Sequence, residues 1–178
     1  MKKNIILTII FTLIQIIIIT IIKGFSYPLL LLFLMLLIFS YISIEDWKTG
    51  EISISLNIAT FVLAGLYSFF SGWNLKVIGL NLLCFVLPFI ILEGLYEIFS
   101  RDKEKFLIGG GDIILFATMS LILSPFNMCV MLFFACLMSI ITSKIIKKSL
   151  VHFAPFIQAG FLIAFLLGDG LRKILFFY

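Results

Sequence analysis

The chain consists of long apolar runs separated by short polar segments. A helix needs about 20 apolar residues to cross a bilayer, and seven of the runs approach that length: Ile5–Ile22, Pro28–Ile44, Ser53–Phe70, Leu75–Phe99, Leu107–Leu123, Phe126–Ile146 and Phe153–Leu167. The last run can continue past Gly170. None has the alternation of polar and apolar residues that a strand would show. The pattern predicts an all-α, polytopic membrane bundle of seven, or alternatively six, transmembrane helices, with residues 1–178 as a single domain.

Composition points to a membrane protein rather than a soluble one. The chain is 63% hydrophobic and 12% charged, and a soluble domain of this size has too little interior for so much apolar surface. The net charge of +4 is too small to indicate a nucleic-acid partner. The cysteines Cys84, Cys129 and Cys136 lie in apolar runs and form no zinc set with the single histidine, His152. We therefore expect buried cysteines, a structural His152, and no metal or cofactor.

Basic residues orient the bundle, because cytoplasmic loops of membrane proteins carry an excess of Lys and Arg. With seven spans, the side that holds the N-terminus receives nine of the 13 basic residues: Lys2, Lys3, Lys48, Arg101, Lys103, Lys105, Lys144, Lys147 and Lys148. The opposite side receives the other four: Lys23, Lys76, Arg172 and Lys173. We therefore expect a cytoplasmic N-terminus, with Asp46 and Asp112 on the cytoplasmic side.

These two aspartates mark helix boundaries. Asp46 follows the second run, and Asp112 opens the fifth after Gly109, Gly110 and Gly111. Each has an ordinary structural explanation: Asp112 suits a helix N-cap, and Asp46 suits a solvated turn. However, carboxylates at the edge of a membrane bundle are costly to desolvate, so a pair of them is a functional candidate.

The pair has the chemistry of an aspartic protease. Two carboxyl groups that share a site do not both ionise readily, so one keeps a proton. The charged group can activate a water molecule, while the protonated group polarises the scissile carbonyl and then protonates the leaving amine. Glycines before Asp112 allow the backbone to approach a substrate or Asp46 closely. We therefore predict Asp46 and Asp112 as catalytic, and Gly109, Gly110 and Gly111 as residues that shape the site.

The same segments resemble the type IV prepilin peptidases, which are membrane aspartic proteases. The sequence "GGGD", residues 109–112, matches the GxGD motif of that family. Asp46 in "DWKTGEISI" fits the spacing of the family's first motif, D-x-x-x-x-x-I-P-N, with Ile52 aligned. The sequence "FAPFIQAG", residues 153–160, looks like the Pro-Phe box before the last helix of the family.

The resemblance has departures as well as implications. Ser53 and Ile54 stand where Pro-Asn is usual, and Ile114 stands where lysine is common, which puts loop shape and substrate preference in question. The resemblance implies cleavage of the basic leader of prepilin or pilin-like proteins, beside a hydrophobic helix, at the cytoplasmic face of the inner membrane. The partners would be that substrate and membrane lipids. Long family members also carry an N-terminal methyltransferase portion with CxxC motifs; its absence from this sequence implies a peptidase alone.

Other polar residues have several explanations. Glu93 and Glu97 lie one helical turn apart near the cytoplasmic end of the fourth run. They are candidates for contact with a basic leader, but exposure to headgroups or pairing with Lys103 or Lys105 is the simpler explanation. In addition, Asp169 between two glycines suits a turn. Two amides inside apolar runs are suited to hydrogen bonds between helices: Gln15 and Asn81.

Three other functions fit parts of the pattern. A small transporter would use the acidic residues as ion sites, although both aspartates map to one face rather than to the midplane. A non-catalytic assembly protein would keep the fold and tolerate replacement of both aspartates. Intramembrane proteases of the presenilin kind also have a GxGD motif, but they normally have Tyr-Asp at the first site, whereas Glu45 precedes Asp46 here.

Overall fold

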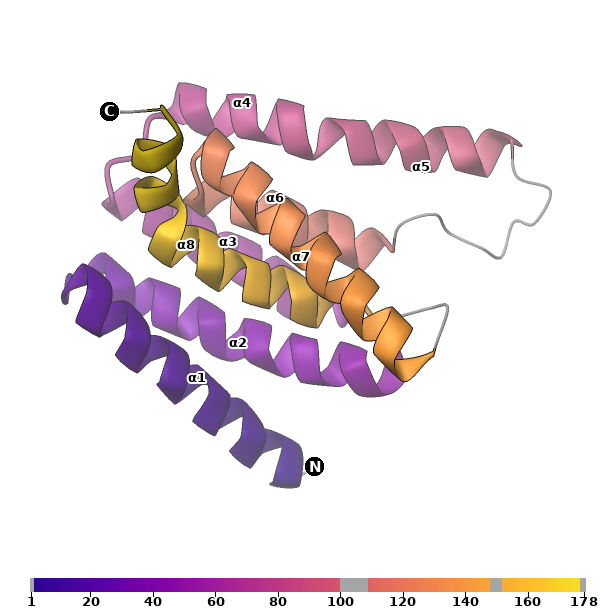
Figure 1. Ribbon diagram of the computed structural model, residues 1–178, viewed down its shortest axis with the longest axis horizontal. Helices are drawn as coiled ribbons and strands as arrows, with labels where there is room; N and C mark the ends of the chain where they lie inside the picture. Colours follow the sequence, from indigo (N-terminus) through magenta and orange to yellow (C-terminus); the bar gives the residue numbers. More distant parts are fainter. Residues whose placement is uncertain (1, 100–108, 148–151, 177–178) are drawn as a thin grey trace.

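The structure, a computed structural model, describes residues 2–99, 109–147 and 152–176 (Figure 1). These residues are almost entirely helical and contain no strand. The helices are α1 (Lys2–Lys23), α2 (Pro28–Thr49), α3 (Ile54–Phe70), α4 (Leu75–Phe85), α5 (Leu87–Phe99), α6 (Gly110–Ile122), α7 (Pro125–Ile146) and α8 (Ala154–Phe176). The predicted all-helical class is therefore confirmed.

Five segments are long and apolar enough to cross a membrane: α1, α2, the continuous stretch Leu75–Ile98, α7 and α8. Helices α3 and α6 are equally apolar but have only 17 and 13 residues, or about 25 and 20 Å at 1.5 Å per residue. Together these seven segments form a multi-pass membrane bundle. Helix α6 is shorter than the hydrocarbon layer is thick, so at least one of its ends lies at membrane depth.

The predicted fourth span is divided in two. Helix α4 ends at Phe85 and α5 begins at Leu87. The cause is Pro88, because proline has no backbone N–H to donate to the preceding turn and its ring clashes with that turn. Helix α5 then runs past the end of the bundle, and its Phe89 ring stacks on Phe116 of α6 at 4.8 Å between centroids.

The second helix is longer than the sequence analysis predicted. It continues through Asp46 to Thr49, rather than ending at Ile44. Its end is set by Gly50, which has a left-handed φ of 75° and donates its N–H to the carbonyl of Asp46 at 2.8 Å. Asp46 therefore lies in the last helical turn and not, as predicted, in a loop.

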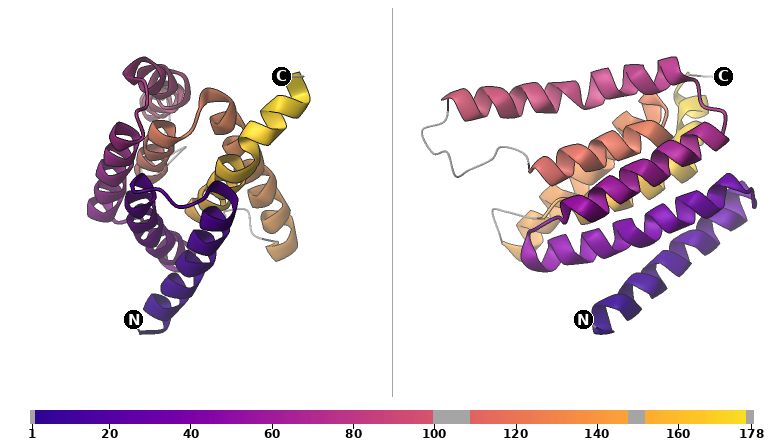
Figure 2. Two further views of the ribbon diagram at one scale, coloured as in Figure 1. Left: turned by 90° about the vertical axis from the view of Figure 1, so that its left-hand side faces the viewer. Right: turned by 180° about the vertical axis from the view of Figure 1, so that it is seen from behind.

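Helix α2 lies between α1 and the rest of the bundle and contacts α1, α3 and α8 (Figure 2). Helix α6 packs on α3, and α7 packs on α8. The α7–α8 contact is close because of Gly160, where an added Cβ would lie 2.5 Å from the Met131 carbonyl oxygen. The predicted hydrogen bonds of the buried amides between helices are confirmed: Gln158 of α8 donates to Gln15 of α1 at 3.2 Å, and Asn81 of α4 donates to the Leu123 carbonyl at 2.7 Å.

Two expectations about polar side chains are wrong. Cys84, Cys129 and Cys136 are exposed rather than buried, because each lies on the outward face of its helix, where lipid is a suitable environment for a thiol. Asp169 lies inside α8 rather than in a turn, because the helix continues through both flanking glycines to Phe176.

The elements alternate in direction, so their connections divide between two ends of the bundle. The C-terminal end of α2 and the N-terminal ends of α6 and α8 meet at one end (Figure 1). The end of α1, the α3–α4 turn and the C-terminal part of α8 lie at the other end. The two candidate aspartates therefore share one end, as the spacing of the apolar runs predicted.

Candidate active site

Asp46 is buried at the junction of α2 and α8, with 4% of its surface exposed. Its Oδ2 accepts a hydrogen bond from the backbone N–H of Ala154 at 3.1 Å. Ala154 is the first residue of α8, and the first N–H groups of a helix have no partner within the helix. The carboxylate therefore caps a helix that lies far away in the sequence, and the positive end of that helix favours a negative charge at Asp46.

His152 lies beside this carboxylate. Its Nδ1 is 3.7 Å from Oδ1 of Asp46. Its ring also covers the backbone of Gly50, where an added Cβ would lie 2.7 Å from the His152 Cε1. Gly50 is thus required twice, once for its left-handed φ and once for the space that the imidazole occupies. Sequence analysis gave His152 a structural role only, whereas the structure places it next to a candidate catalytic group.

Asp112 is the third residue of α6, after Gly110 and Gly111. The N-cap position belongs to Gly109, so the expectation that Asp112 is an N-cap is wrong. The Asp112 side chain is partly buried, and its Oδ1 has no hydrogen-bond partner among the described residues. A buried oxygen without a donor is costly in a folded protein, and such groups concentrate at functional sites.

The structure brings Asp112 and Asp46 together. The two carboxyl groups are close enough for the charge of Asp46 to act on Asp112. One comes from the end of α2 and the other from the start of α6, and like charges repel each other in partly desolvated surroundings. Such a pair holds one proton between two carboxyl groups and is suited to moving protons to and from a bound water and an amide.

The backbone before Asp112 is fixed by two contacts from the segment after Asp46. Asn57, in the first turns of α3, donates its Nδ2 to the Gly111 carbonyl at 2.7 Å and is completely buried. An added Cβ at Gly111 would lie 2.8 Å from Cβ of Ile52. These contacts connect the two candidate motifs directly, so the position of Asp112 depends on the turn that follows Asp46.

The three glycines before Asp112 have different surroundings. Gly111 needs to be glycine because of its contact with Ile52, whereas an added Cβ at Gly110 would meet no atom within 4 Å. At Gly109 the nearest atom would be Oδ2 of Asp112 at 3.5 Å, an ordinary contact distance. The close approach of the Gly111 backbone to Ile52 therefore allows two segments of the same chain to pack together. The role of these glycines toward a substrate stays a prediction.

Asn57 is the residue that sequence reasoning missed. It lies in an apolar run where amides are costly to bury, and that cost is the signal that marks it. The motif comparison stopped at Ile54, three residues before it. Its importance depends on a contact with Gly111 of another helix, which no local pattern reveals.

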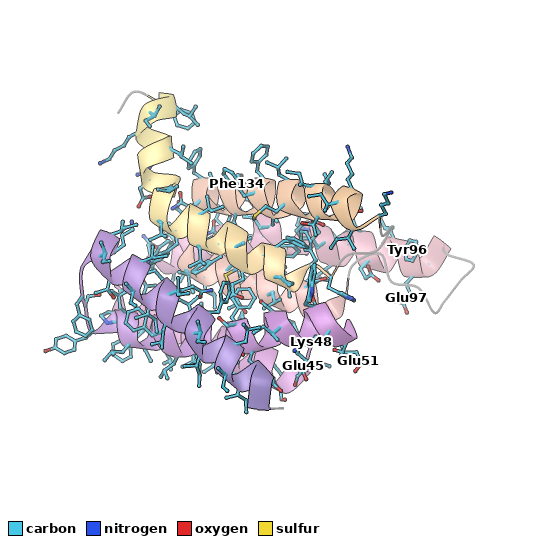
Figure 3. The ribbon with its side chains drawn as sticks, turned by 60° about the horizontal axis from the view of Figure 1, so that its bottom comes forward. Glu45, Lys48, Glu51, Tyr96, Glu97 and Phe134 are labelled. Atoms are coloured by element: carbon cyan, nitrogen blue, oxygen red, sulfur yellow. The ribbon has the colours of Figure 1, made fainter. Side chains whose placement is uncertain are left out.

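Glu93 and Glu97 lie on α5. Glu97 is exposed on the part of α5 that extends past the bundle, whereas Glu45, Lys48 and Glu51 lie near the end of α2 (Figure 3). The suggested partners of the α5 glutamates lie outside the described residues, as do several of the basic residues used for orientation: Arg101, Lys103, Lys105 and Lys148. Contact of either glutamate with a substrate stays a prediction.

The described part of the chain contains no group of three or more His, Cys, Asp or Glu side chains arranged to hold a metal ion. Two carboxyl groups, one imidazole and the surrounding backbone N–H groups are thus the chemical groups that the described site provides. They are suited to proton transfer and to polarisation of a carbonyl.

Comparison with known proteins adds the family. Residues 30–143 match the sequence model of the type IV leader peptidase family, and this region includes both Asp46 and Asp112. None of the curated proteins and none of the solved structures gives a match. The matched region covers more than half of the 178 residues. The chain therefore belongs to the type IV leader peptidase family, and its function is of the leader-peptidase kind.

Proposed function

We propose that the protein is an aspartic endopeptidase that removes the basic leader of prepilin or pilin-like proteins at the cytoplasmic face of the membrane. The observation that carries this proposal is the meeting of two carboxyl groups, Asp46 and Asp112, in one partly buried site of a leader peptidase family member. Hydrolysis of an amide by this pair requires only a water molecule besides the enzyme and its substrate.

We assign the two roles from the hydrogen bonds of each carboxyl group. Asp46 accepts the N–H of Ala154, and a donor of this kind stabilises a charged carboxylate. Oδ1 of Asp112 has no donor among the described residues. Asp46 is therefore the group that takes a proton from the attacking water. Asp112 is the acid that polarises the scissile carbonyl and later protonates the leaving amine.

The proposed side of cleavage rests on charge. Lys48, Lys144 and Lys147 lie at the ends of α2 and α7, at the end of the bundle that holds the aspartates. An excess of basic residues marks the cytoplasmic side. A prepilin-like substrate keeps its basic leader on that side and its hydrophobic helix in the membrane, which places the bond between them at the depth of the carboxyl groups.

Co-expression with a prepilin-like substrate tests the proposal. The chain is expressed with each of several such substrates, and the leader-cleaved product is separated from the precursor on a gel. We expect cleavage by the wild type and by Glu51→Gln, which alters an exposed carboxylate just beyond α2. We expect no product from Asp46→Asn or Asp112→Asn. Product from either asparagine variant, confirmed as correctly inserted, would remove that aspartate from the mechanism.

A further inference from the structure

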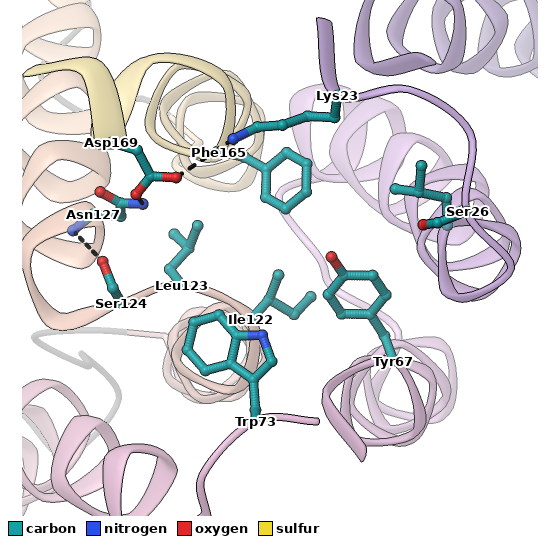
Figure 4. A pocket seen from close by; sticks show the side chains of 11 residues that line it. Lys23, Ser26, Tyr67, Trp73, Ile122, Leu123, Ser124, Asn127, Phe165 and Asp169 are labelled. Atoms are coloured by element: carbon teal, nitrogen blue, oxygen red, sulfur yellow. Dashed lines mark hydrogen bonds and ion pairs between the residues drawn. The ribbon is translucent and has the colours of Figure 1, made fainter. Parts of the chain in front are cut away.

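A polar cavity lies at the end of the bundle opposite the aspartates. Its volume is about 260 Å³. It is formed by residues from six helices, α1, α2, α3, α6, α7 and α8, and from three of the segments that connect helices (Figure 4). Its polar and aromatic lining comes from Lys23, Tyr67, Trp73, Asn127, Phe165 and Asp169. The lining of this cavity carries charged groups of both signs, Lys23 and Asp169, in an otherwise apolar bundle.

Its charges form a loose ion pair. Lys23 Nζ, from the end of α1, lies 3.4 Å from Asp169 Oδ2 on α8 and 5.7 Å from the centre of the Phe165 ring. The Lys23 side chain is 34% exposed and the Asp169 side chain 52% exposed. Exposed pairs of this kind contribute little to stability, so both charges remain available to a ligand that can satisfy them better.

Asp169 is held in place from its other side. Asn127 donates its Nδ2 to Asp169 Oδ1 at 3.3 Å. Asn127 is in turn fixed at the start of α7, where its backbone N–H donates to the Ser124 hydroxyl and its amide packs against the backbone of Gly168. The acidic side of the cavity is therefore pre-organised, while the long Lys23 side chain supplies a mobile cation.

The cavity also holds donors that the protein leaves unused. Within the described residues, the indole N–H of Trp73 and the hydroxyl of Ser26 have no hydrogen-bond partner. Figure 4 shows the Trp73 indole nitrogen and the Tyr67 hydroxyl facing the middle of the cavity; the Tyr67 hydroxyl also has the Ser71 side chain as a hydrogen-bond partner. With Lys23, these groups can surround phosphate oxygens. Asp169 and the aromatic faces suit an ammonium group.

We propose that this cavity binds a zwitterionic phosphoethanolamine group, supplied by the headgroup of a phospholipid. The ligand lies antiparallel to the ion pair, so that its phosphate faces Lys23 and Trp73 while its ammonium faces Asp169. A ligand with a net negative charge is attracted by Lys23 but repelled by Asp169. A ligand with a net positive charge is attracted by Asp169 but repelled by Lys23. The geometry thus selects a neutral zwitterion, independently of the proposed peptidase activity.

A lipid is the favoured source because the cavity lies at the end of the membrane-spanning helices. Apolar side chains also line it, among them Leu29, Ile122 and Leu123, and Trp and Tyr are side chains typical of the membrane interface. Bound in this way, a headgroup would connect the end of α1 to α8 through Lys23 and Asp169. Soluble glycerophosphoethanolamine carries the same phosphodiester and ammonium groups, so the two sources are separated by experiment.

The experiment measures lipid retention on the full chain by native mass spectrometry in detergent. Phosphatidylethanolamine and phosphatidylglycerol with identical acyl chains are titrated separately, and soluble glycerophosphoethanolamine is then added as a competitor. The variants are Asp169→Asn and Lys23→Gln, with Glu51→Gln as the matched control on the other end. Trp73→Phe keeps an aromatic ring but removes the indole N–H. It is the alternative cavity variant if Asp169→Asn or Lys23→Gln fails to fold.

We expect phosphatidylethanolamine to bind the wild type and Glu51→Gln more tightly than phosphatidylglycerol does. We expect each cavity variant to bind it at least about tenfold more weakly, since each loses a hydrogen bond to a charged group. Binding of the soluble compound alone, with the same dependence on Asp169, would keep the zwitterion site but assign a soluble source and overturn the lipid. Equal binding of both lipids, no binding of any ligand, or equal binding by all variants would overturn the site.

Discussion

Asn57 provides the sharpest test of how the two candidate motifs are held together. The change Asn57→Ala removes the donor to the Gly111 carbonyl, which is 2.7 Å away, at a fully buried position. A buried carbonyl left without its partner costs about 1–3 kcal/mol of folding free energy. The same carbonyl group belongs to the residue directly before Asp112, so relaxation of this peptide moves the carboxyl group as well.

The expected effect on catalysis is larger than the effect on substrate binding. A misplacement of about 1 Å in a catalytic group lowers the rate by roughly 100-fold. We therefore expect kcat of Asn57→Ala to fall between about 10-fold and 100-fold, with KM nearly unchanged, because the change affects a group that acts in the transition state. The assay is the initial rate of leader cleavage by purified protein, normalised to the folded fraction.

The matched control is Asn81→Ala. Asn81 is also fully buried, and it donates to the carbonyls of Ser120 and Leu123 at the other end of α6, at 3.1 and 2.7 Å. Its loss costs at least as much stability but leaves the Asp112 end of α6 in place, so we expect kcat to be retained. Equal losses of kcat in the two variants, or an unchanged kcat in Asn57→Ala, would refute a positioning role for Asn57.

Three further predictions follow from the same end of the bundle. Gly111→Ala should lower the free energy of unfolding by about 1–3 kcal/mol, because the added methyl group would overpack against Ile52. Gly110→Ala, which has open space around it, should be neutral or slightly stabilising in the same unfolding assay. Gly50→Ala should destabilise by at least about 1 kcal/mol, since it combines a left-handed φ with a clash against His152; replacing His152 by alanine in the same chain should relieve part of that cost. A plot of kcat/KM against pH should fall on both the acidic and the alkaline side, because the reaction needs one protonated and one charged carboxyl group.

Much of the architecture follows from the sequence because lipid imposes simple rules. Long apolar runs gave the number and order of the crossing segments, and the parity of those segments placed Asp46 and Asp112 at one end. The ends of helices were less predictable. Helix α2 passes Ile44 and stops only at Gly50, where the left-handed backbone closes the last turn, and a composition-based boundary does not weigh that geometry.

What the sequence could not supply are contacts between distant segments. His152 beside Asp46, Ala154 as the donor to that carboxylate, and Asn57 beneath Gly111 each depend on how helices pack. Local sequence patterns do not indicate which residues of distant segments contact each other. The cysteines show a related limit, since their apolar sequence surroundings predicted burial, whereas the structure exposes all three.

The most direct test of the aspartate pair is a double-mutant comparison of kcat/KM for leader cleavage. Purified wild type, Asp46→Asn, Asp112→Asn and the double variant are assayed on one prepilin-like substrate. If the two carboxyl groups act as one unit, each single change lowers kcat/KM by about 100-fold to 10,000-fold, and the double variant is no slower than the slower single variant. Near-normal kcat/KM in either single variant, or losses that multiply in the double variant, would contradict a catalytic pair.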